Sequence, residues 1–210
     1  FGDGRMYMER RIINGRHVEV QIIADNYGAV LLLGERECSL QRRHQKVLEE
    51  APSPALTPQM RAVILPRVVA AVRHVGYRSA GTMELLVDAS GEAWFMEMNT
   101  RLQVEHPVTE EITGIDLVEL QLRVAAGEPL EMVQEDVQVR GHAIECRINA
   151  EDPANNFAPS PGLVTKLSLP STEGCRVDTH LQEGDRISPN YDSMVAKVIV
   201  HGVDRADAIA

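Results

Sequence analysis

Two glutamates occupy positions where they could hold a divalent metal ion. Residues 81–99 predict a β-hairpin with Ser90-Gly91 as its turn, and this register places Glu84 directly opposite Glu97. Opposed carboxylates repel each other, so the pair needs a compensating charge. Asn99 adds an amide oxygen on the same face, and these hard ligands suit Mg²⁺ or Mn²⁺. A solvated polar strand face is the alternative, and a longer turn would shift the pairing.

A second group of chemically capable residues follows this hairpin. Arg101, Gln103 and Glu105 alternate, so an extended backbone would place a cation, an amide and a carboxylate on one face. A guanidinium can hold a planar anion through two hydrogen bonds, and a nearby carboxylate can accept a proton. The alternative interpretation is a charged loop with an internal Arg101–Glu105 ion pair.

A basic run, Gln41-Arg-Arg-His-Gln-Lys46, stands out in an otherwise acidic chain. It predicts either a site for phosphate or another anion, or a solvated run of charge. Aromatic side chains that would stack on bases are missing nearby, which argues against nucleic acid as the ligand. His17 is interpreted as a surface or structural histidine unless other residues supply a ligand context.

These residues need a β-sheet to position them. Residues 16–24 alternate between apolar and polar side chains and predict a half-buried strand with His17, Glu19 and Gln21 on its polar face. Residues 25–28 form a turn and residues 29–34 form the returning strand. The segment 35–50 is dense in charge and has no clean periodicity.

Helices are predicted on either side of the 81–99 hairpin. Thr57 is an N-cap before Pro58, and apolar spacing continues to Gly76, with Pro66 expected to kink or divide this helix. Residues 100–113 are predicted to be irregular. A helix over about 115–126 follows, capped by Asp116 or Gly114. Short strand-like runs then indicate a small β-rich second unit beyond a boundary near 127–140: residues 142–148, 163–169, 176–181 and 194–201.

Composition narrows the class of protein. The 210 residues carry a net charge of −10, which disfavours a nucleic-acid partner, and the apolar runs are too short for a membrane span. Three widely spaced cysteines indicate neither a disulfide framework nor a zinc site, which favours the reducing cytoplasm. A start without Met and a helix that is cut short after Asp204 predict a fragment of a longer protein.

Several long motifs together resemble biotin carboxylase, the ATP-grasp component of biotin-dependent carboxylases. They run along essentially the whole chain: residues 8–10, 16–21, 38–46, 49–52, 97–107 and 140–152. The resemblance implies an α+β fold. Residues 1–127 would be the C-terminal portion of an ATP-grasp domain, an antiparallel sheet with flanking helices, and residues 140–210 a truncated, small β-rich biotin carboxylase C-terminal domain. The family's N-terminal domain and glycine-rich lid would precede Phe1.

The resemblance also implies an activity. Family members use MgATP and bicarbonate to carboxylate biotin on a biotin carboxyl carrier protein or domain, through carboxyphosphate. A carboxyltransferase subunit or domain and a homodimer are implied as partners, and neither nucleic acid nor a membrane is expected. Acetyl-CoA, for fatty acid synthesis, is the default acceptor, with propionyl-CoA, methylcrotonyl-CoA and pyruvate as alternatives. A non-catalytic nucleotide-binding module and another ATP-grasp ligase, such as a carbamoyl-phosphate synthase, are the competing hypotheses.

The motifs assign roles by position. Glu105 resembles the base that deprotonates bicarbonate, and Arg147 the arginine that stabilises the biotin enolate; the catalytic set also includes Arg101 and Lys46. The implied bicarbonate site consists of Lys46, Arg101, Gln103 and Val104. The implied metal ligands, which hold the ATP phosphates, are Glu84, Glu97 and Asn99. The implied nucleotide contacts are Glu9, Arg10 and Ile12 toward adenine, and His17, Gln41 and His44 toward ribose and phosphates. Relatives generally have Lys at position 10, and Arg keeps the charge with a different donor geometry.

Overall fold

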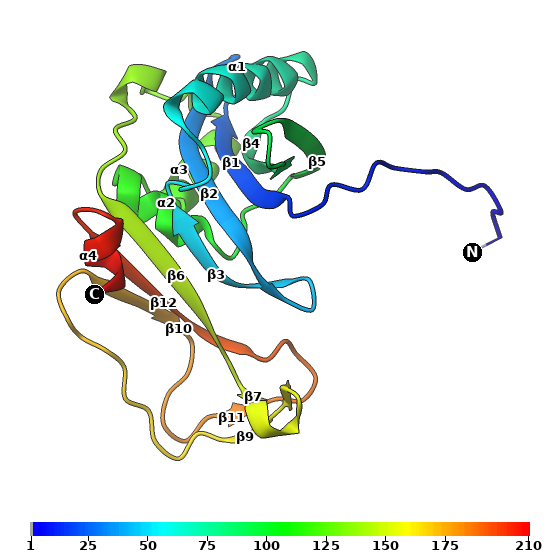
Figure 1. Cartoon of the computed structure of the whole chain (residues 1–210). Helices are drawn as coiled ribbons and strands as arrows, with labels where there is room; N and C mark the ends of the chain where they lie inside the picture. The colour runs from blue at the N-terminus through cyan, green and yellow to red at the C-terminus, as the bar shows by residue number, and fades with distance from the viewer. Residues whose placement is uncertain (1) are drawn as a thin grey trace.

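A single eight-stranded antiparallel sheet organises the computed structural model, which describes residues 2–210 (Figure 1). Its spatial order is β10-β12-β6-β3-β2-β1-β4-β5. The strand bounds are β1 (Arg16–Ala24), β2 (Val30–Arg42), β3 (Gln45–Ala51), β4 (Ser79–Val87), β5 (Ala93–Asn99), β6 (His142–Asn149), β10 (Cys175–Thr179) and β12 (Met194–Gly202). This sheet, with helices on both faces, is the predicted α+β arrangement.

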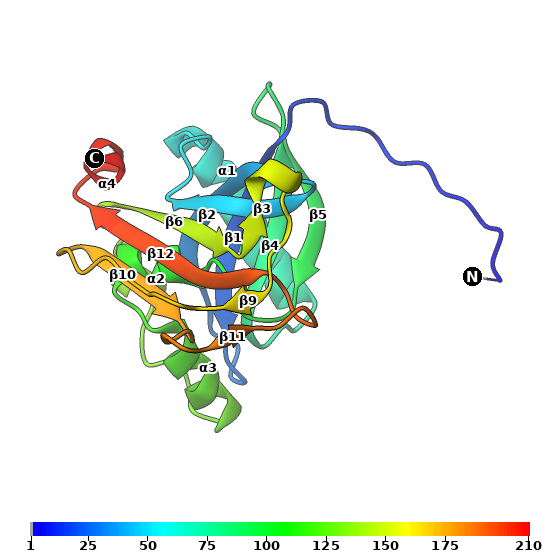
Figure 2. The ribbon, with the colours of Figure 1, turned by 90° about the horizontal axis from the view of Figure 1, so that it is seen from below.

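Helices cover the two faces of the sheet (Figures 1 and 2). Helix α1 (Pro58–His74) packs on one face against alternate residues of β1, β2 and β4. Helices α2 (His106–Thr113) and α3 (Leu117–Ala125) pack on the other face. The remaining elements are short: α4 (Arg205–Ile209), the 3₁₀ turns η1 (Gln134–Asp136) and η2 (Pro153–Asn155), and the strand pairs β7 (Glu151–Asp152) with β8 (Ala158–Pro159) and β9 (Gly162–Leu163) with β11 (Arg186–Ile187).

Strand β1 is buried on both faces, so the prediction of a half-buried strand was wrong. Val18, Val20 and Ile22 belong to the apolar core under α1. On the opposite face, Glu19 and Gln21 are fully buried as well. The alternation of apolar and polar residues was interpreted as solvent exposure, whereas here it separates an apolar core from a buried polar network.

The hairpin of β4 and β5 confirms the predicted opposition of Glu84 and Glu97, although the predicted turn was wrong. The Asp88 amide donates to the Glu92 carbonyl and closes the turn. The loop is therefore residues 89–91, one residue longer than the predicted Ser90-Gly91. A register shift next to Glu84 then restores the predicted pairing. A β-bulge of this kind adds one residue to one strand and offsets the longer turn.

The structure of residues 35–113 adds to and corrects the local predictions. No element was predicted over the charge-dense segment 35–50, where β2 continues to Arg42 and β3 follows. Helix α1 is capped by Thr57 as predicted, and Pro66 does not divide it, since one helix continues to His74. Residues 106–113 form α2, which is short and carries Pro107 in its first turn. The helix predicted over 115–126 is α3, and Asp116 is its cap.

The sheet continues across the predicted boundary at 127–140, because β6 pairs with β3 from the first half of the chain. Strands near 142–148, 176–181 and 194–201 are present as predicted. The strand predicted over 163–169 is wrong, since only Gly162–Leu163 is extended and paired. Residues 2–15 hold no helix or strand and run away from the body of the molecule (Figure 2). Within residues 2–210, no helix is long and apolar enough to cross a membrane.

Candidate active site

A polar cavity of about 480 Å³ opens on the side chains that the sequence motifs single out. Helices α2 and α3 cover only part of their face of the sheet, and the uncovered polar positions line the cavity. Twelve of the predicted site residues line it: His17, Gln41, His44, Lys46, Glu84, Glu97, Asn99, Arg101, Gln103, Val104, Glu105 and Arg147. The structure therefore gathers residues from β1, β2, β3, β4, β5 and β6 at one place.

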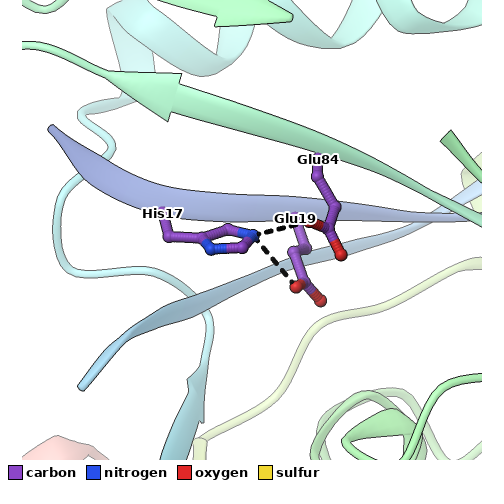
Figure 3. A group of neighbouring side chains, drawn as sticks. All are labelled: His17, Glu19 and Glu84. Atoms are coloured by element: carbon purple, nitrogen blue, oxygen red, sulfur yellow. Dashed lines mark ion pairs between the residues drawn. The ribbon is translucent and has the colours of Figure 1, made fainter. Parts of the chain in front are cut away.

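His17 lies between two buried carboxylates (Figure 3). Its Nε2 is 3.2 Å from Glu19 and 3.0 Å from Glu84, while Gln41 contacts the other ring nitrogen at 3.0 Å. Burial alone would lower the pKa of His17, but hydrogen bonds to the two carboxylates outweigh burial and raise it to about 9. Burial would raise the pKa of both glutamates, but His17 and the neighbouring cations lower each to about 2. The side chains therefore form a charged cluster, and His17 is not a surface histidine.

Lys46 joins three carboxylates at the centre of the cavity. Its Nζ contacts Glu19, lies 2.6 Å from Glu105 and 3.3 Å from Glu84. Burial would lower the pKa of Lys46, but the surrounding carboxylates raise it above its ordinary value. The basic run thus turns inward at its last residue, and the interpretation as a solvated run of charge fails for Lys46.

Glu105 is held by two cations. It is 2% exposed, and its two oxygens lie 2.6 Å from Lys46 Nζ and 3.0 Å from Arg147 Nη2. The Nε of Arg147 donates to Glu49 at 2.6 Å. The predicted Arg101–Glu105 pair is not formed. Residues 100–105 form a loop instead of an extended segment, and exposed Arg101 reaches the carbonyl of Leu102.

The residues suggested as metal ligands fit a hard cation by their donor chemistry. Glu84 Oε1 accepts from Asn99 at 2.7 Å and from Gln103 at 2.9 Å, while Glu97 is exposed on the wall of the cavity. Two carboxylates and a carboxamide oxygen therefore converge on the cavity from β4 and β5. Oxygen ligands of this kind suit Mg²⁺ or Mn²⁺, as the sequence predicted.

Arg36 on β2 holds several side chains of the site in place, and no role was predicted for it from the sequence. This fully buried side chain donates to Gln21, Thr109, Glu19, Thr82 and Gln103 at 2.6 to 3.2 Å. Arg36 thereby orients Glu19, which pairs with Lys46, and Gln103, which donates to Glu84. Because Arg36 lies in a charge-dense segment without periodicity, only a register that buries that segment could have revealed it.

Residues from the C-terminal part complete the cavity wall. Asn149, Asp192 and Met194 line it, although no role was predicted for any of them. The tip between β2 and β3, which carries His44, is held by the same part: Arg42 pairs with Glu151 and stacks on Phe157 with its guanidinium carbon 4.0 Å from the ring centre. The site therefore depends on both parts of the chain.

Three predicted nucleotide contacts lie outside the cavity. Glu9, Arg10 and Ile12 belong to the segment that runs away from the body, and Arg10 lies over the ring of Trp94 at 5.0 Å. Their proposed place beside adenine therefore stays a prediction.

Comparison with protein families assigns the two parts of the chain. Residues 1–133 match the family model of the carbamoyl-phosphate synthase L chain ATP-binding domain. Residues 145–210 match the model of the biotin carboxylase C-terminal domain. The fold and the charged cavity thus define an ATP-binding protein of the ATP-grasp class.

Individual relatives narrow this class. The chain is 53% identical over its full length to a biotin carboxylase from Allochromatium vinosum, of which it covers 46%, and 52% identical over its full length to a pyruvate carboxylase subunit from Methanothermobacter thermautotrophicus, of which it covers 42%. A crystal structure of the Hydrogenobacter thermophilus 2-oxoglutarate carboxylase biotin carboxylase domain dimer, with MgADP, ADP and bicarbonate, matches 96% of this chain and 44% of that one, with a TM-score of 0.93 and 51% identity. The chain belongs to the biotin carboxylase family and spans about half the length of the curated relatives it matches.

Proposed function

We propose that the full-length protein containing this chain carboxylates biotin at the expense of ATP and bicarbonate. The observation that carries the proposal is the placement of Glu105 between Lys46 and Arg147 in a cavity that also holds a carboxylate pair for a metal. A base, two cations and a hard-cation site are the equipment that phosphoryl transfer to bicarbonate needs. The family membership and the MgADP and bicarbonate in the related crystal structure support the proposal.

In the proposed first step, bicarbonate binds near Arg101, Gln103 and Val104, and Glu105 accepts its proton. A carbonate oxygen attacks the γ-phosphorus of ATP, and the bond from that phosphorus to the oxygen bridging to the β-phosphate breaks. The products are carboxyphosphate and ADP. Lys46 supplies positive charge beside Glu105, which counters the charge that accumulates as the anions meet.

Glu84, Glu97 and Asn99 would hold the metal ion. When bound, the metal neutralises phosphate charge and aligns the terminal phosphates. His17, Gln41 and His44 lie on the same cavity and are proposed to contact ribose and phosphates. Glu9, Arg10 and Ile12 remain the proposed adenine contacts, which requires their segment to approach the cavity.

In the proposed second step, carboxyphosphate breaks down to CO₂ and phosphate. The released phosphate takes the proton from N1′ of biotin, and the N1′ electrons of the resulting enolate form a bond to CO₂. Arg147 stabilises the enolate oxygen by its positive charge. Lys46 and Arg147 share Glu105, so the proposed bicarbonate and biotin sites adjoin each other.

We further propose a biotin carboxyl carrier and a carboxyltransferase as partners, a homodimer as the assembly and the cytoplasm as the location. A dimer in the related crystal structure supports the assembly, and three free cysteines fit a reducing compartment. Acetyl-CoA is the proposed acceptor. Relatives named for pyruvate and 2-oxoglutarate make a keto acid the alternative. Residues 1–127 and 140–210 are proposed as the two units, joined by the common sheet.

Biotin-dependent ATP hydrolysis by the full-length protein tests this function. Wild type should hydrolyse ATP only when bicarbonate and biotin are both present, and Arg147→Ala should lose the biotin-dependent part. Arg123→Ala is the matched control, because Arg123 pairs with Glu128 and Glu131 on the outside of α3. Hydrolysis that needs no biotin would contradict the proposal. Binding of ATP·Mg²⁺ without turnover would instead favour the non-catalytic module.

A further inference from the structure

A second carboxylate pair lies behind Arg147, where the proposed reaction does not use it. Glu49 on β3 and Glu145 on β6 are direct partners across the two strands, and both are fully buried. Cβ atoms of directly opposed residues lie about 4.5–5.5 Å apart in an antiparallel pair. The two side chains therefore lie next to each other on the same face of two central strands.

The two members of this pair differ in their partners. Glu49 Oε1 accepts from Arg147 at 2.6 Å, whereas Glu49 Oε2 and both oxygens of Glu145 have no hydrogen-bond partner within residues 2–210. An ionised carboxylate that is buried without partners is very costly, but a protonated one can donate a hydrogen bond. Glu145 therefore has no hydrogen bond that would stabilise it as an anion within residues 2–210.

The cations near Glu145 are engaged elsewhere. Arg147, two residues along β6, uses its guanidinium on Glu49 and Glu105. Lys197 on β12 donates to the Val104 carbonyl at 2.9 Å and lies 3.4 Å from Asp178.

Apolar side chains from α2 and β12 surround this part of the sheet, beside the charge of Lys197. Helix α2 contributes Val108 and Ile112, and β12 contributes Ile199, which is paired with Glu145. Two opposed buried carboxylates cannot both ionise cheaply, and the one with the guanidinium keeps its charge. Burial raises the pKa of Glu145 to about 8 against the opposing charges of Lys197 and Arg147, and it raises the pKa of Glu49 to about 7 against the opposing charge of Arg147.

We infer that the Glu49–Glu145 pair carries one negative charge, with Glu145 neutral and Glu49 ionised, and that Glu49 is the positioning residue that orients Arg147 beside Glu105. A neutral Glu145 has a hydroxyl that can donate, and Glu49 Oε2 on the paired strand has no other donor within residues 2–210. Glu49 acts on the reaction only through Arg147. This catalytic consequence rests on the proposed function, whereas the charge assignment does not.

The same chemical change at the two positions tests the assignment in the full-length protein. Glu145→Gln replaces a neutral acid with a neutral amide, so its kcat should stay within about twofold of wild type. Glu49→Gln removes the charge that orients Arg147, so kcat should fall about 10- to 100-fold with little change in the KM for ATP. Glu49→Asp keeps the charge and should recover much of the loss. Equal losses in the two glutamine variants, or a loss confined to Glu145→Gln, would overturn the inference.

Infrared difference spectroscopy gives a readout that does not depend on activity. At pH 7 the protein with ¹³C-labelled glutamate should show a protonated-carboxyl band that Glu145→Gln removes and Glu49→Gln retains. Loss of the band in Glu49→Gln, or its absence in wild type, would refute a neutral Glu145. If wild type lacks biotin-dependent hydrolysis, the proposed function fails, and this spectrum still decides the charge assignment.

Stability against pH is the second independent readout. The pKa of Glu145 rises from an ordinary 4.5 to about 8 on folding, so wild type loses stability as pH rises through that window. Glu145→Gln has no proton to lose, so its advantage over wild type in chemical unfolding should grow from pH 5 to pH 8. An unchanged difference across this range would contradict the inference.

Discussion

The two faces of β1 are both closed to solvent, but they differ in what they bury. Val20 and Ile22 pack with α1 in an apolar core, while Glu19 and Gln21 on the other face join a network of ion pairs and hydrogen bonds. Apolar burial is favourable by itself, whereas buried charge is tolerated only when partners compensate it. One face thus stabilises the sheet, and the other holds charged groups beside the cavity at a cost in stability.

Glu105→Gln should give the largest effect on the polar face. A glutamine cannot accept the bicarbonate proton, and loss of a general base lowers turnover by about 10²- to 10⁴-fold. Steady-state, biotin-dependent ATP hydrolysis measures this change. Glu119→Gln, an exposed substitution on α3, is the control. Full activity in Glu105→Gln would show that another group accepts the proton.

Arg36→Met tests whether the buried network also maintains the fold. The substitution leaves Glu19 with one cation fewer and removes the donor to Gln103, so the free energy of unfolding should fall by about 3–5 kcal/mol. Urea unfolding monitored by circular dichroism measures it. Arg36→Lys keeps the charge and should lose less. A methionine variant as stable as wild type would mean that the polar face tolerates loss of its central cation.

Ile22→Ala is the corresponding change on the apolar face. Loss of a fully buried side chain under α1 should cost about 2–5 kcal/mol of unfolding free energy. The KM for ATP should not change, because Ile22 points away from the cavity. Combined unfolding and kinetic measurements distinguish this variant from Arg36→Met. A raised KM for ATP would contradict the separation of the two faces.

Thr57→Ala should have the smallest effect. The Thr57 hydroxyl accepts from the Met60 amide at 3.2 Å at the start of α1, and loss of such a cap costs about 1 kcal/mol. A shift in thermal unfolding without a change in turnover is expected. Thr57→Ser keeps the hydroxyl and should behave like wild type. A loss of turnover in Thr57→Ala alone would couple α1 to the site.

Local patterns predicted some elements well and missed others for physical reasons. Thr57 and Asp116 were found as caps because a cap is encoded within a few residues. The opposition of Glu84 and Glu97 was found despite a wrong turn, because the bulge offset it. Strand β3 was missed because its charged residues do not alternate with apolar ones. Lys46 pairs with Glu19, 27 residues away, and a local pattern cannot reveal so distant a partner.

The position of β6 beside β3 determines when the site can form during folding. Glu49 and Arg147 are 98 residues apart in the chain, so their contact closes a long loop. Closing a long loop costs chain entropy before the contact it permits can stabilise the fold, so contacts between distant segments form slowly. The hairpins β1–β2 and β4–β5 can assemble locally, but Glu105 gains Arg147 only after the last third of the chain has joined the sheet. Catalytic competence should therefore lag behind strand formation in a refolding experiment.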